Sequence, residues 1–245
     1  PYRLDRGIVT RLPPVTLPWP VMNHDFVLTD HHLVFCVGPI LTRPLKFLLG
    51  LASFDDTLHW EGGKPTLLIL VPRDGRGEPR TIEIEPFFQF HFANGFEEDG
   101  AVVLDLARYA DYHTVGQALR DYWRSEWPAS GLATLTRLRV DLSTGRLDKR
   151  TFDTGLQQQL ARIDFETGTV TRHDFGPDGY PGEPMFIATG PAEDEGVVVT
   201  LVFDASSRLT SIVGLDARDL ASRPLFTGRL AHHVPFSLHG YFAAQ

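Results

Sequence analysis

Short segments in which apolar and polar residues alternate dominate the chain, and turn residues separate them. Alternation with a period of two is the pattern of a β-strand with one buried face. Turns are indicated by stretches such as Arg73-Asp74-Gly75 and Ser143-Thr144-Gly145. The pattern predicts strands over residues 26–29, 32–37, 66–71, 80–85, 87–92, 101–105, 134–141, 146–153, 161–165, 169–174, 185–188, 196–204, 209–216 and 225–230.

Only one stretch has the spacing of an amphipathic helix. Residues 114–123 carry Val115, Leu119 and Tyr122 at helical intervals, which predicts a single short helix. The fold class is therefore all-β.

Two segments of the chain repeat the same arrangement. Residues 138–145 and 160–168 each end a predicted strand in Asp and turn at Thr-Gly into the next strand. Recurring hairpins of this kind are typical of a β-propeller, whose blades are small antiparallel sheets around an axis. At four strands per blade, about fourteen strands make three to four blades, so we expect an incomplete set of propeller blades.

The predicted strand at residues 87–92 carries a histidine. Alternation is expected to put Phe88, Phe90 and Phe92 on one face, and Gln89 and His91 on the other. The packing face would hold the strand rigidly and aim His91 away from it. Taken alone, such a histidine is interpreted either as a structural residue or as a metal ligand.

Composition and charge exclude several classes of function. The 245 residues are 42% hydrophobic, which is enough for a sizeable core, and the net charge is −8 without any Lys/Arg-rich run. A nucleic-acid backbone is therefore not an expected partner. The single cysteine, Cys36, excludes an intramolecular disulfide and a cysteine-based zinc site. It lies in an apolar run, so we expect a buried thiol and a reducing cytoplasm.

The chain begins at Pro1 without an initiator Met or an apolar signal core, which suggests the middle of a longer protein. No apolar run approaches the length of a membrane-crossing helix. The most apolar stretch, residues 39–51, is interrupted by Arg43, Pro44 and Lys46. Two interpretations stay open for it: peripheral contact with a membrane surface, or a buried lid or connection between strands.

Three histidines lie in distinctive frames: His24 in Asn-His-Asp-Phe-Val-Leu-Thr, His91 in Phe-His-Phe-Ala-Asn-Gly-Phe-Glu-Glu, and His239 in Pro-Phe-Ser-Leu-His-Gly-Tyr. Together with residues 180–187 and 193–204, these motifs resemble the carotenoid cleavage oxygenase family. The resemblance covers residues 15–245 in the family's order. Residues 24–29, 33–35, 48–51, 53–55 and Trp60 resemble most the bacterial apocarotenoid oxygenases within it.

The resemblance implies a seven-bladed propeller with Fe(II) on its axis, held by four histidines. His24, His91 and His239 match three of these ligands, and the remaining ligand belongs to a motif N-terminal to Pro1. Glu183, in Gly-Glu-Pro, matches a glutamate that hydrogen-bonds a ligand imidazole. Neutral imidazoles suit Fe(II), and a carboxylate on the distal ring N–H fixes the orientation of the ring.

The implied activity is a dioxygenase that cleaves a carbon–carbon double bond of an apocarotenoid or carotenoid to aldehydes. Its partners would be dioxygen and an apolar polyene held in an apolar tunnel. Compared with the family pattern, the N-terminal portion and a hairpin region near residues 156–160 are missing, so residues 1–245 are expected to form one partial propeller domain. Two alternatives stay open: a non-catalytic propeller fragment, and a stilbene-cleaving dioxygenase of the same family.

The other polar residues in these frames are expected to be structural or exposed. Asp25 would either orient His24 or cap a turn. The turn and loop histidines are His31, His32, His232 and His233, and the histidines expected on a solvated surface are His59, His113 and His173. Glu97, Glu98, Asp194 and Glu195 are interpreted as loop and turn residues.

Overall fold

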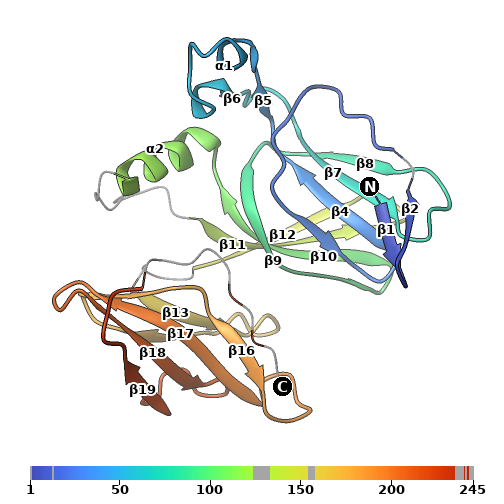
Figure 1. Cartoon of the computed structure of the whole chain (residues 1–245). Helices are drawn as coiled ribbons and strands as arrows, with labels where there is room; N and C mark the ends of the chain where they lie inside the picture. The colour runs from blue at the N-terminus through green and yellow to red at the C-terminus, as the bar shows by residue number, and fades with distance from the viewer. Residues whose placement is uncertain are drawn as a thin grey trace. The chain divides into compact units, whose positions relative to one another are not determined.

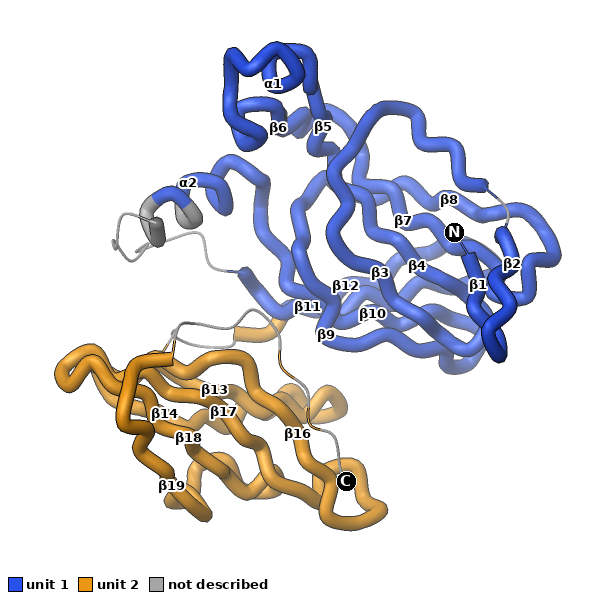
Figure 2. The backbone as a smooth tube through the Cα atoms, in the orientation of Figure 1, with its two compact units in different colours: residues 1–151 blue, residues 152–245 orange. Residues whose placement is uncertain are grey.

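The chain forms two compact units, residues 1–151 and residues 152–245, which are coloured separately in Figure 2. The structure is a computed structural model, and it describes residues 2–12, 14–123, 133–153, 158–234, 240 and 242. The single partial propeller domain expected over residues 1–245 stays a prediction.

Unit 1 contains two four-stranded antiparallel sheets (Figure 1). The first has the strand order β3-β4-β7-β8 and the second the order β12-β11-β10-β9. Their strands are β3 (Phe26–Leu28), β4 (His32–Val37), β7 (Thr66–Pro72), β8 (Arg80–Ile84), β9 (Phe88–Glu98), β10 (Ala101–Tyr109), β11 (Thr134–Asp141) and β12 (Leu147–Phe152). Four antiparallel strands are the usual make-up of a propeller blade.

One apolar core joins these two sheets. Leu68 and Leu70 of β7 pack with Leu104 and Leu106 of β10, and all four side chains are buried. The alternate residues of β7, such as Ile69, point to a second cluster on the opposite face. Because β7 is buried on both faces, its sequence is a continuous apolar run rather than an alternating one.

Strand β9 departs from regular alternation next to His91. Between Leu106 and Arg108, strand β10 advances two residues while the partners on β9 run from Phe92 to Gln89, a step of three. The extra residue is a β-bulge, which shifts all later side chains to the opposite face. The predicted alignment of three phenylalanines on one face is therefore wrong.

The side chains of β9 show this shift directly. Phe88 and Phe90 pack in the cluster that contains Ile40, whereas Phe92 packs against the core between the two sheets. Gln89, expected to point away from packing, is 5% exposed and donates its amide to the carbonyl of Cys36 at 3.4 Å. The bulge leaves His91 on the side of Phe90, and their ring centroids lie 6.1 Å apart.

Smaller elements complete unit 1. They are β1 (Tyr2–Asp5), β2 (Ile8–Arg11), β5 (Ile40–Thr42), α1 (Leu45–Leu48), the 3-10 helix Asp55–Thr57, β6 (Leu58–Trp60) and α2 (Tyr112–Trp123). The predicted helix is thus present as α2. The β1–β2 hairpin was missed, although Arg6 and Gly7 at its turn have φ angles of 47° and 83°.

Residues 43–57 connect β5 to β6, and the short helix α1 lies within this connection (Figure 1). Leu45, Leu48 and Leu51 are exposed by 69%, 73% and 73% of their surface. The run at residues 39–51 is therefore a connection between strands, as one of its two interpretations held, but its leucines are not buried. Within the described residues, no helix is long and apolar enough to cross a membrane.

Unit 2 is an antiparallel β-structure. Strands β15, β17, β18 and β19 pair in that order, β16 also pairs with β17, and β13 pairs with β14. Their bounds are β13 (Gln159–Ile163), β14 (Val170–Asp174), β15 (Gly179–Pro181), β16 (Met185–Ala188), β17 (Gly196–Asp204), β18 (Leu209–Asp216) and β19 (Phe226–Arg229). Leu160, Val202, Val213, Leu215 and Leu220 form its core.

The two similar sequence segments form similar hairpins, as predicted. Asp141 ends β11 and accepts the backbone N–H of Thr144 at 2.7 Å, and Asp164 follows β13 and accepts the N–H of Thr167 at 2.8 Å. The hydroxyl of Ser143, followed by the N–H of Thr144, holds the pKa of the Asp141 carboxyl below its usual value, and the N–H of Thr167 does the same for Asp164.

Candidate functional site: a histidine pair at the meeting of two sheets

His24 and His91 lie side by side in unit 1. Their ring centroids are 5.2 Å apart and the ring planes meet at 82°. His24 lies in the segment that leads into β3 of one sheet, and His91 lies in β9 of the other sheet. Residues 67 positions apart in the sequence are thus brought together by the packing of β3 on β9.

Phe90 gives this pair an aromatic wall. Its ring lies edge-on to that of His24 at 5.7 Å, and it neighbours the ring of His91 at 6.1 Å. The β-bulge in β9 makes this possible, because it turns His91 to the same side as Phe90. Bulges next to functional sites often redirect a side chain in this way.

The separation of the two rings suits a shared metal ion. Two imidazoles that each place a nitrogen about 2.1 Å from one ion have ring centres roughly 5 Å apart. His24 is exposed and His91 is partly exposed, so both rings are accessible. Neutral imidazole is a good ligand for Fe(II) and related divalent metals. The residues present therefore fit two positions of a histidine-ligated metal.

The other predicted site residues are not tested by this geometry. His239 lies outside the described residues. Glu183 lies in unit 2, in the connection between β15 and β16, and its side chain is exposed. Across the described ranges, which end at residue 242 with gaps, no group of three or more His, Cys, Asp or Glu side chains is arranged to hold a metal ion.

An aromatic cluster extends away from the histidine pair. Phe90 packs with Phe88, whose ring it meets edge-on at 4.6 Å, and Phe88 in turn meets Tyr112 at 5.3 Å. The cluster consists of Ile40, Phe88, Tyr112 and Val115, with Met22, Leu58, Trp60, Phe90 and Tyr109 packed against it. Burial raises the pKa of Tyr109 above its usual value. One side of the histidine pair is thus apolar and aromatic.

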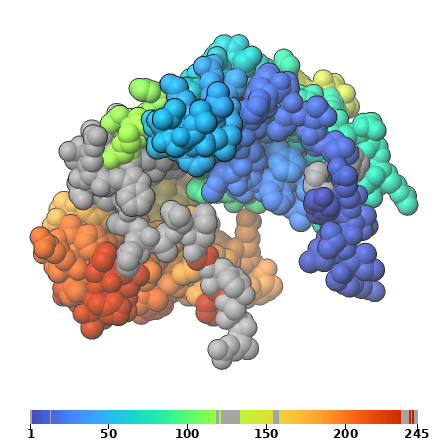
Figure 3. Space-filling model, turned by 45° about the horizontal axis from the view of Figure 1, so that its top comes forward, coloured from blue at the N-terminus to red at the C-terminus, as the bar shows by residue number. Residues whose placement is uncertain are grey.

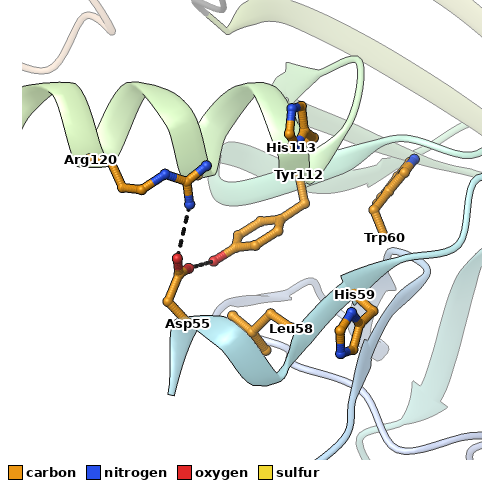
Figure 4. Close-up of a pocket in the computed structure, with 8 residues that line it drawn as sticks. Asp55, Leu58, His59, Trp60, Tyr112, His113 and Arg120 are labelled. Atoms are coloured by element: carbon orange, nitrogen blue, oxygen red, sulfur yellow. Dashed lines mark hydrogen bonds and ion pairs between the residues drawn. The ribbon is translucent and has the colours of Figure 1, made fainter. Parts of the chain in front are cut away.

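A pocket of about 370 Å³ lies at the far side of this cluster (Figure 4). Leu58, Trp60 and Tyr112 belong both to its lining and to the cluster. The remaining lining residues are Asp55, His59, His113, Gly116 and Arg120. The pocket therefore combines an aromatic wall with several polar groups.

Asp55 organises the polar side of the pocket. Its carboxylate accepts the hydroxyl of Tyr112 at 2.9 Å and pairs with the guanidinium of Arg120 at 2.9 Å, as the dashed lines in Figure 4 mark. Burial, followed by this hydrogen bond and the charge of Asp55, raises the pKa of Tyr112. The Tyr112 hydroxyl is therefore a fixed, neutral donor rather than an acid.

The sequence predicts that Asp25 either orients His24 or caps a turn. In the structure its carboxylate contacts both β3 and β9. One carboxylate oxygen accepts the N–H of Phe26 at 2.8 Å, and the other accepts the N–H of Phe92 at 2.9 Å. Asp25 follows His24 and Phe92 follows His91. The carboxylate therefore joins the backbones next to the two histidines.

Glu97 was interpreted as a loop residue, and that interpretation is wrong. Both Glu97 and Glu98 belong to β9, and the side chain of Glu97 is only 13% exposed. Desolvation on its own would raise the pKa of Glu97, but hydrogen bonds from Thr29, His32 and His31 outweigh it and lower the pKa to about 2. In the sequence, the only signal for these partners is the run of polar residues at 29–32, which can donate hydrogen bonds to a carboxylate.

The structure confirms the roles predicted for Cys36, Asp194 and Glu195 but not the one predicted for His173. Cys36 is buried, as expected, and burial raises the pKa of its thiol to about 12. Asp194 and Glu195 lie at a turn, where Asp194 pairs with Arg162 at 3.1 Å. His173 was expected in solvent, but its half-buried ring hydrogen-bonds the carbonyl of Leu220 at 2.8 Å.

Comparison with known protein families gives a match over nearly the whole chain. The family described as retinal pigment epithelial membrane protein matches residues 2–156 and 146–244. Among curated proteins, the apocarotenoid-15,15'-oxygenase of Synechocystis is 30% identical over 97% of this chain and 55% of its own length. The carotenoid 9,10(9',10')-cleavage dioxygenase 1 of Phaseolus vulgaris is 25% identical over 95% of this chain and 50% of its own length.

Solved structures give the same result. The crystal structure of cobalt-substituted Synechocystis apocarotenoid oxygenase superposes with a TM-score of 0.85 and 28% identity, covering 100% of this chain and 58% of that one. This match confirms the predicted β-propeller fold class. The chain spans about half the length of the curated relatives that it matches.

Proposed function

The chain belongs to the carotenoid cleavage oxygenases of the retinal pigment epithelial membrane protein family, and we propose that it takes part in the oxidative cleavage of a carbon–carbon double bond of an apocarotenoid or other carotenoid. The observation that carries this proposal is the histidine pair. The ring centroids of His24, just before β3, and His91, in β9, lie 5.2 Å apart, and both rings contact the Phe90 ring. A metal on such a pair would face an apolar substrate.

In this proposal, His24, His91 and His239 would hold Fe(II), and the carboxylate of Glu183 would orient one imidazole. The donor set is supported by the chemistry of neutral imidazoles, which favours Fe(II) over the hard cations that prefer oxygen ligands. When bound, the iron supplies the redox chemistry that lets dioxygen react with a double bond. Cobalt is present in the solved structure of a relative, which supports a metal at the corresponding place in this chain.

The residues of this chain would position the substrate. A polyene is apolar and rigid, so it is bound by exclusion of water along an aromatic surface rather than by hydrogen bonds. Phe90 and Tyr109, which are partly exposed, provide such a surface beside the histidine pair, and the buried Phe88 packs against both. Their ring contacts with each other, at 4.6 to 6.5 Å, hold the wall in one geometry.

The class of substrate has an alternative within the same chemistry. A stilbene also presents a carbon–carbon double bond between apolar groups, and the same aromatic wall would accept it. The pairwise similarity to an apocarotenoid oxygenase and to carotenoid dioxygenases favours a carotenoid-type substrate.

A product assay tests this function. The purified chain is loaded with Fe(II) without oxygen, mixed with a β-apocarotenal or a hydroxystilbene, exposed to air and analysed for aldehydes by mass spectrometry. We expect aldehydes from the apocarotenal, a loss of product on His91→Ala and no change on His232→Ala, an exposed histidine. Aldehydes from the stilbene alone would change the substrate class. A folded, metal-loaded chain without products would favour a non-catalytic propeller fragment.

We further infer peripheral contact with a membrane through the connection between β5 and β6. Residues 45–54 form the light-blue protrusion in Figure 3. Six of them are exposed large hydrophobic residues: Leu45, Phe47, Leu48, Leu49, Leu51 and Phe54. Arg43 precedes them and Lys46 lies among them, and such a mixture of cationic and apolar side chains binds at the headgroup region of a bilayer. Contact there would give an apolar substrate direct access to the protein from the lipid phase.

A further inference from the structure

The edges of two sheets meet at the histidine pair. Strand β3 is the outer strand of one four-stranded sheet, and β9 is the outer strand of the other. The two strands pack against each other, but within the described residues no ladder of backbone hydrogen bonds pairs them. Something other than sheet pairing must therefore fix the position of β3 along β9.

Asp25 fixes one end of β3. Phe92 belongs to the outer strand β9, and an outer strand leaves N–H groups on its free edge without a strand partner. The Asp25 carboxylate accepts the N–H of Phe92 at 2.9 Å, and its second oxygen accepts the N–H of Phe26 at 2.8 Å. A hydrogen bond to an ionised acceptor is stronger than a neutral one, so this junction is a firm one.

Glu97 fixes the other end of β3. One carboxylate oxygen accepts the hydroxyl of Thr29 at 2.6 Å and the N–H of His31 at 3.0 Å. The rings of His31 and His32 lie 2.9 and 3.0 Å from the same carboxylate. Thr29 follows β3 directly and is 3% exposed, so this second junction is largely shielded from water.

The middle of β3 lies directly on β9. A Cβ atom at Gly95 would lie 2.2 Å from Cγ1 of Val27, so the Val27 side chain of β3 packs directly on the backbone of β9 at Gly95. Val27 itself is buried in the core between the sheets. Thus β3 touches β9 at its centre and is tied to it by a carboxylate at each end.

We propose that Asp25 and Glu97 are positioning residues that lock the register of β3 on β9, and thereby set the separation of His24 and His91. The proposal rests on the ligand role of the two histidines in the proposed function. The two carboxylates act through the backbone next to the pair and through the far end of the same short strand.

The first test measures the separation itself, in the metal-free chain. The carbon-bound ring protons of His24 and His91 are expected to give an NMR cross-peak through space. Asp25→Asn keeps only one acceptor oxygen, so one of the two N–H groups loses its partner, and we expect the cross-peak to disappear. Asp30→Asn is the matched control, since Asp30 lies in the same hairpin and its carboxylate bonds no described residue.

The second test measures metal affinity with Co²⁺ as the probe, from its visible absorption. Loss of a partner that orients metal ligands typically weakens metal binding about 10–100-fold. We expect a loss of about tenfold for Asp25→Asn and for Glu97→Gln. Glu98→Gln, next to Glu97 in β9 and exposed, is expected to bind like the wild type.

Thr29 separates positioning from folding. Thr29→Val removes the hydroxyl donated to Glu97, and Thr29→Ser keeps it. We expect the valine variant to lose the cross-peak while the serine variant retains it, with both variants still folded. If Asp25→Asn does not fold, this pair decides alone.

An intact cross-peak in folded Asp25→Asn, or in Thr29→Val, would overturn the proposal. A wild-type chain that shows the cross-peak but binds no Co²⁺ would instead contradict the proposed function and leave the register lock standing.

Discussion

Val27 and Gly95 lie closer together than any side chain at position 95 would permit. A Cβ there would come within 2.2 Å of Val27 Cγ1 and within 3.2 Å of Leu104 Cδ2. At this contact the outer strands of the two sheets in unit 1 touch. Val27 lies a few residues after His24 in the sequence, and Gly95 lies a few residues after His91. The close approach of β3 to β9 therefore depends on the absence of a side chain at Gly95.

Gly95→Ala should destabilise unit 1. Forcing an extra carbon into a filled core typically costs about 1–3 kcal/mol of unfolding free energy. Urea unfolding followed by tryptophan fluorescence measures it. Gly63→Ala is the control, because a Cβ there meets no atom within 4 Å, and we expect a change within about 0.5 kcal/mol. Equal stability of the two variants would contradict the close contact.

Arg137→Met should be strongly destabilising. The Arg137 guanidinium makes two hydrogen bonds of 2.7 Å to Asp105, whose side chain is 1% exposed. Removing the cation leaves a buried carboxylate without its partner, which typically costs about 3–5 kcal/mol. Chemical denaturation measures the loss. Arg146→Met removes an exposed ion pair with Asp148 and should cost less than about 1 kcal/mol.

Glu97 should make stability depend on pH in the acid range. Its folded-state pKa of about 2 lies below the ordinary value of 4.5, so its stabilisation is complete above about pH 4.5 and is lost as the pH falls toward 2. Other carboxylates titrate in the same range, so the difference between wild type and Glu97→Gln is the measure. That difference in thermal midpoint should shrink steadily from pH 5 to pH 2. A constant difference would show that Glu97 has no depressed pKa.

Leu48→Asp should abolish membrane binding if the connection between β5 and β6 enters the lipid. Leu48 is 73% exposed, so the substitution should leave folding unchanged. Flotation with phosphatidylcholine vesicles measures binding, and apolar insertion predicts that it persists at high salt. Leu225→Asp, at another exposed leucine, is the control. Binding that survives Leu48→Asp would rule out this surface.

Local patterns predicted most of the fold. Every strand predicted from alternation has a counterpart in the structure, and so does the helix. The alternation is visible in the sequence because successive side chains of a strand point to opposite faces, of which one is buried. The family membership predicted from the motifs around His24, His91 and His239 is confirmed by the family match. These features depend on residues that are close together in the sequence.

The orientation of His91 and the partners of Asp25 and Glu97 could not be predicted, because they depend on contacts between residues far apart in the sequence. The bulge at Phe90–Phe92 arises from how β9 pairs with β10, so alternation placed His91 on the wrong face. The partners of Glu97 lie 65 or more residues away, and so does the Asp25 contact with Phe92. Only the folded arrangement of the two sheets brings these residues together.

In the proposed function, His24 and His91 bind one metal ion. The direct measurement is the iron content of the purified chain, expressed with added iron and handled without oxygen. We predict stoichiometric iron in the wild type and in His232→Ala, and its loss in both His24→Ala and His91→Ala. A wild-type chain without iron, or alanine variants that retain it, would contradict the claim.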